Sequence, residues 1–390
     1  MELTIESIRP GDEERRHALM RQAFNATSPF DPEAPELAPE RVVCAYDGDD
    51  LVGSVITLDF HQTWGGRQVR CGGVSGVAVA PQARGRGAAR HMLVESFQRM
   101  SARGEVVSAL YPTTASLYRS VGYEVVAWFE RRRFAVGEVV APATTLDWRA
   151  TTPADPVVRE LHDRMAADLD GWFRIDPDWW AHGARRAESE GGVNRFTYVG
   201  RRDGTDVAAV RYRYDRSETA MYDIDVEVVA GVDHEAVGAA LALVAGHGTT
   251  VGQIRTALPA PLLAPHLPQL QRAARAEDWP LMLRLVDAPA AIEARRYPRS
   301  VEGRVALDVV DDVLLANGGP HVLEVAGGEG RLVRGGAGDV AVTAQDLAVL
   351  YAGGDVRALR AAGRLTGATD ADLELLAAAF VSSPSIPLFF

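Results

Sequence analysis

The sequence contains one segment and one further residue whose types and spacing could do chemistry. The first is the stretch from Val77 to Arg90, in which alternating valines lead into a loop with two glycines and three arginines. Glycines let the main chain approach a ligand closely, and the unpaired amides at the start of a helix attract anions, so this pattern predicts a cradle for a phosphate or pyrophosphate group. The second is Tyr118, whose phenol could give its proton to a leaving group.

The loop alone leaves alternatives open, because any tight turn between a strand and a helix can use two glycines. Its sequence, Gln82-Ala83-Arg84-Gly85-Arg86-Gly87-Ala88, lacks the GxGxxG spacing of dinucleotide-binding loops and the Gly-Lys-Ser/Thr ending of the Walker loop. It resembles the Q/R-x-x-G-x-G/A signature of the GNAT acyl-CoA N-acetyltransferases. The resemblance implies that the loop amides hold the CoA pyrophosphate and that the preceding strand pairs with the pantetheine arm.

A second GNAT signature surrounds Tyr118. The run from Ser116 to Tyr123 resembles L/I-Y-x-x-x-G-Y/F, which closes the GNAT active site with its first tyrosine facing the sulfur. The resemblance implies that Tyr118 is the general acid that protonates the CoA thiolate. The alternative is that Leu117, Tyr118 and Val121 only share the core face of a helix. Tyr123, at the start of a strand, is predicted to be structural.

Elements in an α+β order must position these residues. Periodicity predicts strands at residues 3–8, 42–60, 68–80, 105–110 and 123–134, a hairpin turn at Gly65-Gly66, and helices at 12–26, after Gly87 and at 113–120. The helix after Gly87 places an apolar stripe on one face, consisting of Ala89, Met92, Leu93, Phe97 and Met100. The GNAT fold has the same order of elements, so residues 1–140 are predicted to be an acetyl-CoA-binding GNAT domain.

Two further domains are predicted. Residues 137–153 carry prolines and small residues typical of a connector. Helices are then predicted at 155–170 and 177–190, and the order of elements in 141–287 repeats that of the first domain. Its strand-to-helix turn, Val228 to His234, lacks the arginines and the paired glycines, so we expect a degenerate GNAT-like domain that holds no pyrophosphate. Residues 288–390 combine short strands with helices at 343–352, 355–362 and 369–380, and they finish in an apolar tail.

The domain order and several motifs resemble the enhanced intracellular survival (Eis) family of GNAT N-acetyltransferases across the entire chain. The matching motifs are Val77-Ala78-Val79-Ala80-Pro81, Arg84-Gly85-Arg86-Gly87 with Arg90, Leu117-Tyr118 through Gly122-Tyr123, Val286 to Tyr297, and Phe390. The resemblance implies a tandem GNAT fold, a sterol-carrier-protein-like α/β domain in residues 288–390, and a homo-oligomer, namely a hexamer. It also implies that the main-chain carboxylate of Phe390 reaches the first domain as the general base.

The same resemblance implies which residues bind acetyl-CoA, the co-substrate, without a metal. They are Val77, Ala78 and Val79 along the pantetheine and acetyl group, Arg84, Gly85, Arg86, Gly87, Ala88, Ala89 and Arg90 around the pyrophosphate, and Thr113 and Thr114 beside the cofactor. A main-chain carboxyl of pKa ~3.5 is a weak base in water, and burial among the last three residues would raise that pKa. The alternatives for this tail are an apolar peg between domains or a frayed end.

The acceptor is predicted only as an amine. In the Eis family, carboxylates and aromatic rings receive aminoglycosides or other cationic amines, and some come from the loop after the first helix, here Phe24 to Glu33. Trp172, Phe173, Trp179 and Trp180 could wall a cationic pocket or form a core. The predicted function is acetyl transfer to an aminoglycoside-like small molecule or a lysine-type amine. Transfer of a longer acyl chain, or lipid binding without catalysis, are the alternatives.

Composition argues against several other classes of protein. A formal charge of −12 disfavours nucleic-acid binding, and the run Arg131-Arg132-Arg133 is expected to be a solvated strand end. No apolar run approaches the ~20 residues of a membrane-spanning helix, and no signal-peptide pattern opens the sequence, so we expect a cytoplasmic protein without a membrane partner. Cys44 and Cys71 are expected to be buried and unpaired. All 41 basic residues are arginine, a composition typical of a GC-rich genome.

Overall fold

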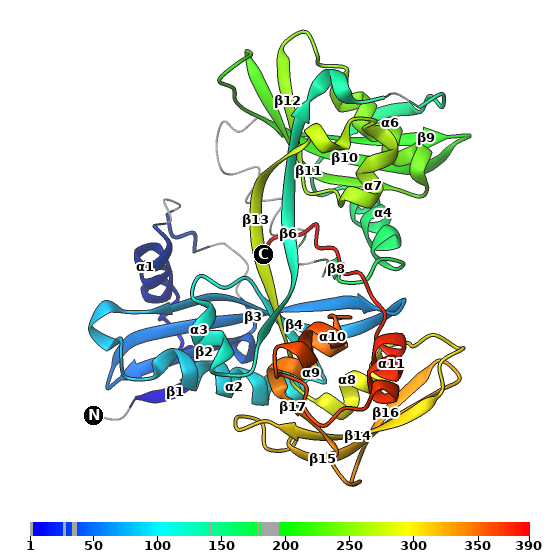
Figure 1. Cartoon of the computed structure of the whole chain (residues 1–390). Helices are drawn as coiled ribbons and strands as arrows, with labels where there is room; N and C mark the ends of the chain where they lie inside the picture. Colours follow the sequence, from blue (N-terminus) through cyan, green and yellow to red (C-terminus); the bar gives the residue numbers. More distant parts are fainter. Residues whose placement is uncertain are drawn as a thin grey trace. The chain divides into compact units, whose positions relative to one another are not determined.

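The computed structural model describes residues 3–25, 29–32, 37–140, 142–175, 177, 180 and 195–390. They fall into two compact units (Figure 1). The first contains the described residues up to Val126 together with Leu281–Ser383 and Phe390, and the second contains the described part of Ala127–Pro280 together with Pro384–Phe389. Both units mix helices and strands, so the predicted α+β class is confirmed. None of the helices in the described ranges has the length and apolar character needed to cross a lipid bilayer.

The first unit contains the strands predicted for the GNAT domain except 123–134, which is β6 (Glu124–Ala135) and belongs mostly to the second unit. The strands of this part are β1 (Thr4–Ser7), β2 (Val42–Asp47), β3 (Asp50–Trp64), β4 (Arg67–Val79), β5 (Val107–Leu110) and the part of β13 (Ala274–Leu285) from Leu281 onward. They lie in the order β1-β2-β3-β4-β5-β13. The β4–β5 pair is parallel, and the other neighbours with a recorded register are antiparallel. The predicted strand region 42–60 thus contains two strands, β2 and β3, joined by a turn at Gly48.

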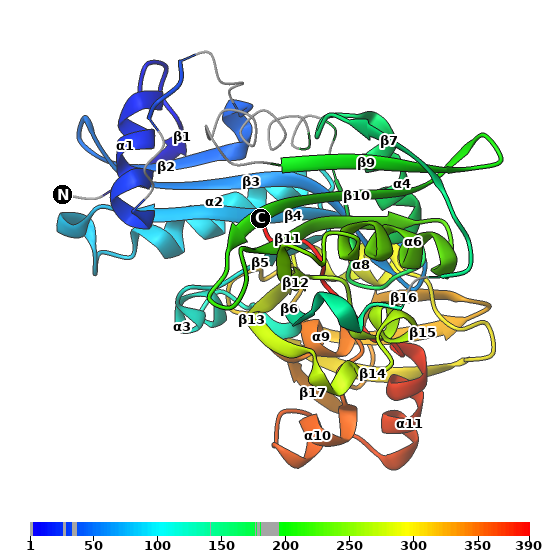
Figure 2. The same ribbon diagram turned by 90° about the horizontal axis from the view of Figure 1, so that it is seen from above.

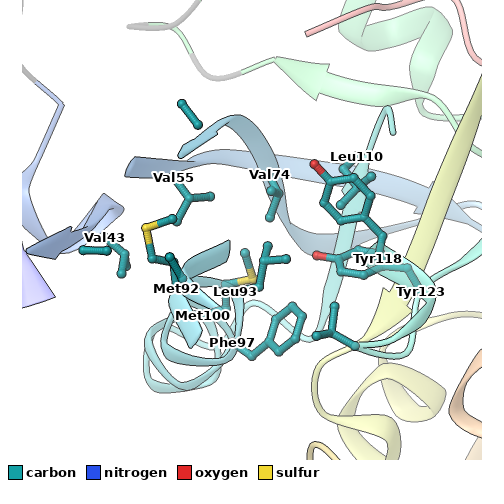
Figure 3. Packing of buried hydrophobic residues seen from close by; sticks show 14 of the residues in the cluster. Val43, Val55, Val74, Met92, Leu93, Phe97, Met100, Leu110, Tyr118 and Tyr123 are labelled. Atoms are coloured by element: carbon teal, nitrogen blue, oxygen red, sulfur yellow. The ribbon is translucent and has the colours of Figure 1, made fainter. Parts of the chain in front are cut away.

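The helices of this part are α1 (Glu13–Phe24), α2 (Ala88–Ala102) and the short α3 (Ala115–Arg119). Helix α2 lies along β3 and β4 (Figure 2). The buried residues of α2 are Ala88, Met92, Leu93, Ser96, Phe97 and Met100. All of them except Ser96 pack in one apolar cluster with strand residues such as Val55 and Val74 (Figure 3). The predicted stripe is confirmed except in the first turn, where Ala88 is buried and Ala89 is only half-buried.

The first unit also contains a smaller sheet with its own helices. The strands are β14 (Gly303–Val310), β15 (Gly319–Ala326), β16 (Glu329–Arg334) and β17 (Val340–Thr343), and the helices are α8 (Ala288–Ala294), α9 (Ala344–Tyr351), α10 (Val356–Ala361) and α11 (Asp370–Ala379). The sheet order is β16-β15-β14-β17, with β14 and β17 parallel. Reciprocal hydrogen bonds between Thr343 and Asp346 start α9, and those between Thr369 and Asp372 start α11. The three helices predicted in this region are confirmed.

The second unit contains a further set of paired strands. They are β6 (Glu124–Ala135), β7 (Asp147–Thr151), β9 (Arg195–Arg202), β10 (Thr205–Arg216), β11 (Tyr222–Gly231) and β12 (Val251–Thr256), and the short β8 (Phe173–Ile175) lies outside their order. The helices are α4 (Pro156–Ala166), α6 (His234–Ala245) and the short α7 (Ala260–Leu263). The order is β6-β12-β11-β10-β9-β7. Strands β6 and β13 each have residues in both units.

One sequence prediction for the second unit is wrong, and another concerns residues that the structure does not describe. Residues 137–153 are not a plain connector, because they contain β7, which pairs with β9 from Asp147 opposite Arg201 to Thr151 opposite Thr197. A polar, proline-flanked segment is a strand here because a partner distant in sequence supplies its hydrogen bonds. The helix predicted at 177–190 falls almost entirely outside the described residues.

The strands of the two units show the same local arrangement. In the first unit, the parallel β4–β5 pairing ends where Gly73 lies opposite Ala109, and the β3–β4 register shifts between Ser54 and Ile56. In the second unit, the parallel β11–β12 pairing ends at Val226, and the β10–β11 register shifts between Arg211 and Tyr212. In each case the longer strand continues beyond its parallel partner and leads to a helix, which is the repeat that the sequence predicts.

Candidate active site

Strand β4 offers an open edge where the predicted pantetheine contacts lie. Within the described residues, β4 pairs with β5 only from Cys71 to Gly73, although β4 continues to Val79. On its other side β4 stays paired with β3 as far as Val79, which lies opposite Gly53. The stretch with Val77, Ala78 and Val79 therefore presents main-chain donors and acceptors on one side without a partner strand. An extended ligand that carries amide groups could pair with this edge as a strand would.

The loop after β4 exposes the start of α2. Gly85 and Gly87 have φ angles of +76° and +78°, a region that residues with a side chain rarely adopt. Gly87 directly precedes α2, and no side chain among the described residues caps the first turn. The amide of His91 donates to the carbonyl of Gly87 at 3.0 Å, so the amides of Ala88–Arg90 precede the first bond within the helix. With the helix dipole behind them, these amides attract an anion.

The loop arginines are already engaged with the protein. The Nε atom of Arg84 donates to the carbonyl of Val79 at 3.3 Å, and Nη1 of Arg90 donates to the carbonyl of Ser120 at 2.5 Å. Arg86 pairs with Asp47 at 2.5 Å, and this hydrogen bond holds the pKa of the Asp47 carboxyl below its ordinary value. Because a carboxylate already offsets the charge of Arg86, the net positive charge that the loop offers a phosphate comes from Arg84 and Arg90.

Tyr118 is buried with its phenol protonated. Its side chain is 5% exposed, and burial raises its pKa to about 12. Within the described residues, no hydrogen bond of its hydroxyl is found, whereas the Tyr123 hydroxyl lies 2.6 Å from Oγ of Ser108, which in turn donates to the carbonyl of Gly72. The two rings are 6.1 Å apart at 82° (Figure 3). Tyr123 thus has a structural role, while the proton of Tyr118 is available at neutral pH.

Phe390 packs in the first unit where β4 and β5 separate. Its ring lies edge-on to Phe60 at 4.9 Å and to Tyr111 at 5.2 Å between ring centroids. A methyl group added at Gly73 would lie 3.1 Å from Cε2 of Phe390, so the ring sits directly over that glycine. Gly73 is the last residue of β4 that pairs with β5.

The structure therefore brings Tyr118 and Phe390 to the same part of the first unit. Tyr118 belongs to the apolar cluster that includes Val74 and Leu110. The ring of Phe390 contacts the residues directly before Val74 and after Leu110, namely Gly73 and Tyr111. Thr113 and Thr114 lie exposed between Tyr111 and α3, and Thr114 is the residue that precedes the helix.

The residues before Phe390 are packed in the second unit and are not frayed. The amide of Ser385 donates to the carbonyl of Asp170 at 3.0 Å, and Nε1 of Trp172 donates to the Ser385 hydroxyl at 3.0 Å. The Phe389 ring lies 5.6 Å from Phe129 and 5.8 Å from Trp279. Aromatic contacts of this kind stabilise one path of the tail.

The start of α6 shows why the second unit has no comparable anion site. Asp233 precedes α6, and its carboxylate accepts a hydrogen bond from the amide of Ala236 at 2.8 Å. Glu235 adds a second negative charge in the first turn. A carboxylate here both occupies the helix start and repels a phosphate. The expectation that this turn binds no pyrophosphate now has a physical reason.

The aromatic residues considered for a cationic pocket are mostly core. Trp172, Phe173 and Trp180 are 1%, 0% and 6% exposed. The guanidinium of Arg211 lies 4.8 Å above the Trp180 ring. Trp179 lies outside the described residues, as do residues 26–28 and 33 of the loop that follows α1. The structure thus assigns the three described rings to packing.

The arginine run, the two cysteines and possible metal ligands were also considered from the sequence. The run Arg131-Arg132-Arg133 is solvated only in part, because Arg133 is exposed near the end of β6, whereas Arg131 is mostly buried and pairs with the buried Asp225. Cys44 and Cys71 are buried and unpaired, as predicted. Among the described residues, no group of three or more His, Cys, Asp or Glu side chains is arranged to hold a metal ion.

Sequence reasoning missed three residues that contact the predicted site residues. They are Asp47, which pairs with Arg86, and Phe60 and Tyr111, which receive Phe390. Tyr111 directly follows β5, and an aromatic residue at the end of a central strand was the available signal. The other two come from β2 and β3 and carry no motif.

Comparison with known proteins identifies the class of enzyme that this fold and site define. Residues 4–126 and residues 171–285 each match a model described as an acetyltransferase (GNAT) domain, and residues 288–389 match a sterol carrier protein domain. The predicted fold of two GNAT-like domains followed by a sterol-carrier-like domain is confirmed. The protein is a GNAT N-acetyltransferase.

Whole-chain relatives give the family. An uncharacterized N-acetyltransferase from Streptomyces griseus is 30% identical over 330 residues, covering 77% of this chain and 76% of the relative. The N-acetyltransferase Eis of Mycobacterium tuberculosis is 28% identical over 361 residues, covering 88% of this chain and 86% of Eis. The crystal structure of Eis1 from Mycobacterium abscessus has the same fold, with a TM-score of 0.82 at 21% identity over 99% of this chain and 100% of that one. This chain belongs to the Eis family.

Proposed function

We propose that this enzyme transfers the acetyl group of acetyl-CoA to an amine, using the first GNAT domain. The observation that carries the proposal is the uncapped start of α2 beside the open edge of β4. A pyrophosphate fits the amides of Ala88–Arg90, and an arm with amide groups fits Val77–Val79. Acetyl-CoA supplies the activated thioester. The second unit, where Asp233 occupies the helix start, offers no such fit.

We propose Tyr118 as the general acid and the main-chain carboxylate of Phe390 as the general base. The amine nitrogen attacks the thioester carbonyl, so a C–N bond forms and the C–S bond breaks, and no covalent enzyme intermediate is needed. The Phe390 carboxylate takes the proton that the nitrogen loses, and Tyr118 gives its proton to the departing sulfur. Protons exchanged with water then restore both groups.

The surroundings of each group suit these roles. Tyr118 stays protonated until about pH 12, so a proton is always present to stabilise a developing thiolate. A thiolate in the same apolar surroundings is itself disfavoured, which brings the proton affinities of the two groups closer together. The rings of Phe60 and Tyr111 pack against the ring of Phe390 and so hold the end of the chain in the first unit.

We propose a cationic small molecule of the aminoglycoside type, or a lysine-type amine, as the acceptor. The family resemblance and the net charge of −12 support this class, because cations accumulate near an acidic protein. The same proposal includes three domains with the bounds 1–140, 141–287 and 288–390. It also includes a hexamer and a cytoplasmic location, where acetyl-CoA is made.

Thiol release measured with a panel of donors and acceptors tests this function. We expect free CoA from acetyl-CoA with at least one aminoglycoside, polyamine or lysine peptide, and a much slower release without acceptor. Because the chain contains no lysine, self-acetylation of lysine cannot add to the signal. Faster turnover of octanoyl- or myristoyl-CoA than of acetyl-CoA would identify a long-chain acyltransferase instead. Absence of CoA binding by calorimetry would favour a lipid-binding protein.

A further inference from the structure

The turn that follows Tyr118 is packed against a buried arginine. Gly122 has a φ of +89°, and a methyl group added there would lie 1.4 Å from Nη1 of Arg284. The guanidinium therefore takes the space that any other residue's side chain would need. The amides of Gly122 and Tyr123 donate to the carbonyls of Arg119 and Tyr118 at 3.0 and 3.1 Å, which closes the turn directly on the tyrosine.

The third domain supplies the counter-charge of this arginine. Arg284 is fully buried, and its Nη2 donates to both carboxylate oxygens of Asp311 at 2.8 Å. Asp311 lies just after β14, and it is fixed by hydrogen bonds from the amides of Val313 and Leu314 at 3.1 and 2.8 Å. Nδ2 of Asn317 also donates to it at 3.3 Å. Arg284 is thus held in one position against Gly122.

The third domain also holds α3 from outside. The Nε2 atom of Gln345, in α9, donates to the carbonyl of Arg119 at 2.8 Å. Arg364 pairs with Glu124, the first residue of β6, at 3.1 Å and with Asp346 at 2.6 Å. These contacts lie at the end of α3 and just after its turn, so the segment that carries Tyr118 is held on two sides.

We propose that the third domain positions Tyr118 through the Arg284–Asp311 pair, Gln345 and Arg364. Helix α3 has 5 residues, too few to be stable without neighbours. No hydrogen bond among the described residues orients the Tyr118 hydroxyl, so its direction depends on the backbone of α3 and the turn and on the packing of its ring. This inference rests on the proposed function, in which Tyr118 is the acid. It gives the sterol-carrier-like domain a role in the acetyl transfer of the first domain.

The double variant Gln345→Ala/Arg364→Gln tests this positioning without disturbing the buried pair. We expect kcat to fall ~10-fold with KM for acetyl-CoA unchanged, because small displacements of a reacting group cost about this much or more. Hydrogen exchange of the amides in residues 115–123 should be faster. The matched control Arg304→Gln removes an exposed ion pair with Glu324 inside the third domain and should change neither quantity.

The same substitutions made in a Tyr118→Phe enzyme distinguish a failure of this inference from a failure of the proposed general acid. In Tyr118→Phe, the double variant should cause no further loss of kcat. An equal further loss in that background, or unchanged exchange of residues 115–123, would show that these residues do not position Tyr118. A fully active Tyr118→Phe enzyme would refute the acid itself, and the inference with it. Asp311→Asn is the variant for the buried pair, and we expect the same pattern of effects from it.

Discussion

Replacing Tyr118 by phenylalanine removes one oxygen from a buried ring. The ring is 5% exposed and belongs to the cluster with Leu110 and Val121. Since the Tyr118 hydroxyl makes no hydrogen bond to the described residues, the variant loses none within that part of the chain. We expect the free energy of unfolding at pH 8 to change by less than about 1 kcal/mol.

The effect on catalysis should be much larger. Loss of a general acid costs roughly 10²- to 10⁴-fold in rate, or about 2.7 to 5.4 kcal/mol of the activation free energy. The loop proposed to hold the pyrophosphate is a separate element, so KM for acetyl-CoA should stay within about threefold. Thiol release at saturating amine measures kcat, and calorimetry with CoA measures binding.

The same variant tests the burial of the phenol through alkaline stability. Burial raises the pKa of Tyr118 from 10.0 to about 12, so the folded protein keeps this proton at a pH where the unfolded chain loses it. The resulting stability is fully present below pH 10 and is lost as the pH rises toward 12. At pH 11 the loss amounts to about 1.4 kcal/mol in the wild type and is absent in Tyr118→Phe.

Urea denaturation of both proteins at pH 8 and pH 11 measures how much unfolding free energy each protein loses between the two pH values. The contributions of the other tyrosines cancel in the comparison because both proteins contain them. A Tyr118→Phe enzyme that keeps more than a third of the wild-type kcat would refute the assignment of the acid. An unfolding free-energy difference that does not change with pH would refute the burial argument.

The other predictions concern the anion site, the tail and the buried ion pair. Gly87→Asp should raise the Kd of CoA at least ~10-fold in calorimetry, because a carboxylate would then stand at the helix start; unchanged affinity would place the pyrophosphate elsewhere. Gly73→Ala should lower kcat, because a new methyl group would lie 2.6 Å from the ring of Phe60 and 3.1 Å from that of Phe390 and would displace both; a normal kcat would separate this pair of rings from catalysis. Asp311→Ala should lower the free energy of unfolding by about 3 to 5 kcal/mol in urea denaturation, since it leaves Arg284 buried without its counter-ion; a loss below 1 kcal/mol would contradict that burial.

Local sequence patterns were enough to predict the elements on which the proposed chemistry rests. The apolar spacing of α2, the glycines at 85 and 87, and the segment around Tyr118 are all encoded within short stretches of sequence. A helix start or a left-handed turn depends on a few neighbouring residues, so the sequence shows it directly. The repeat of the fold was visible for the same reason.

The features that the sequence did not reveal depend on distant partners. Strands β7 and β12 form because β9 and β11 supply hydrogen bonds, and neither segment alternates strongly by itself. The roles of Asp47 and Arg284 come from partners at Arg86 and Asp311. An arginine is ordinarily a surface residue, and only the folded chain shows that Arg284 is buried.

The most direct test of the composite site adds two glycines after Phe390, with an enzyme tagged only at its N-terminus as the matched control. The extension moves the main-chain carboxylate away while leaving the aromatic ring and the loop of Gly85 and Gly87 unchanged. We predict that kcat falls by at least ~100-fold, the size of a general-base contribution, while the Kd of CoA stays the same. An extended enzyme with the kcat of the control would contradict the assignment of Phe390 as the base.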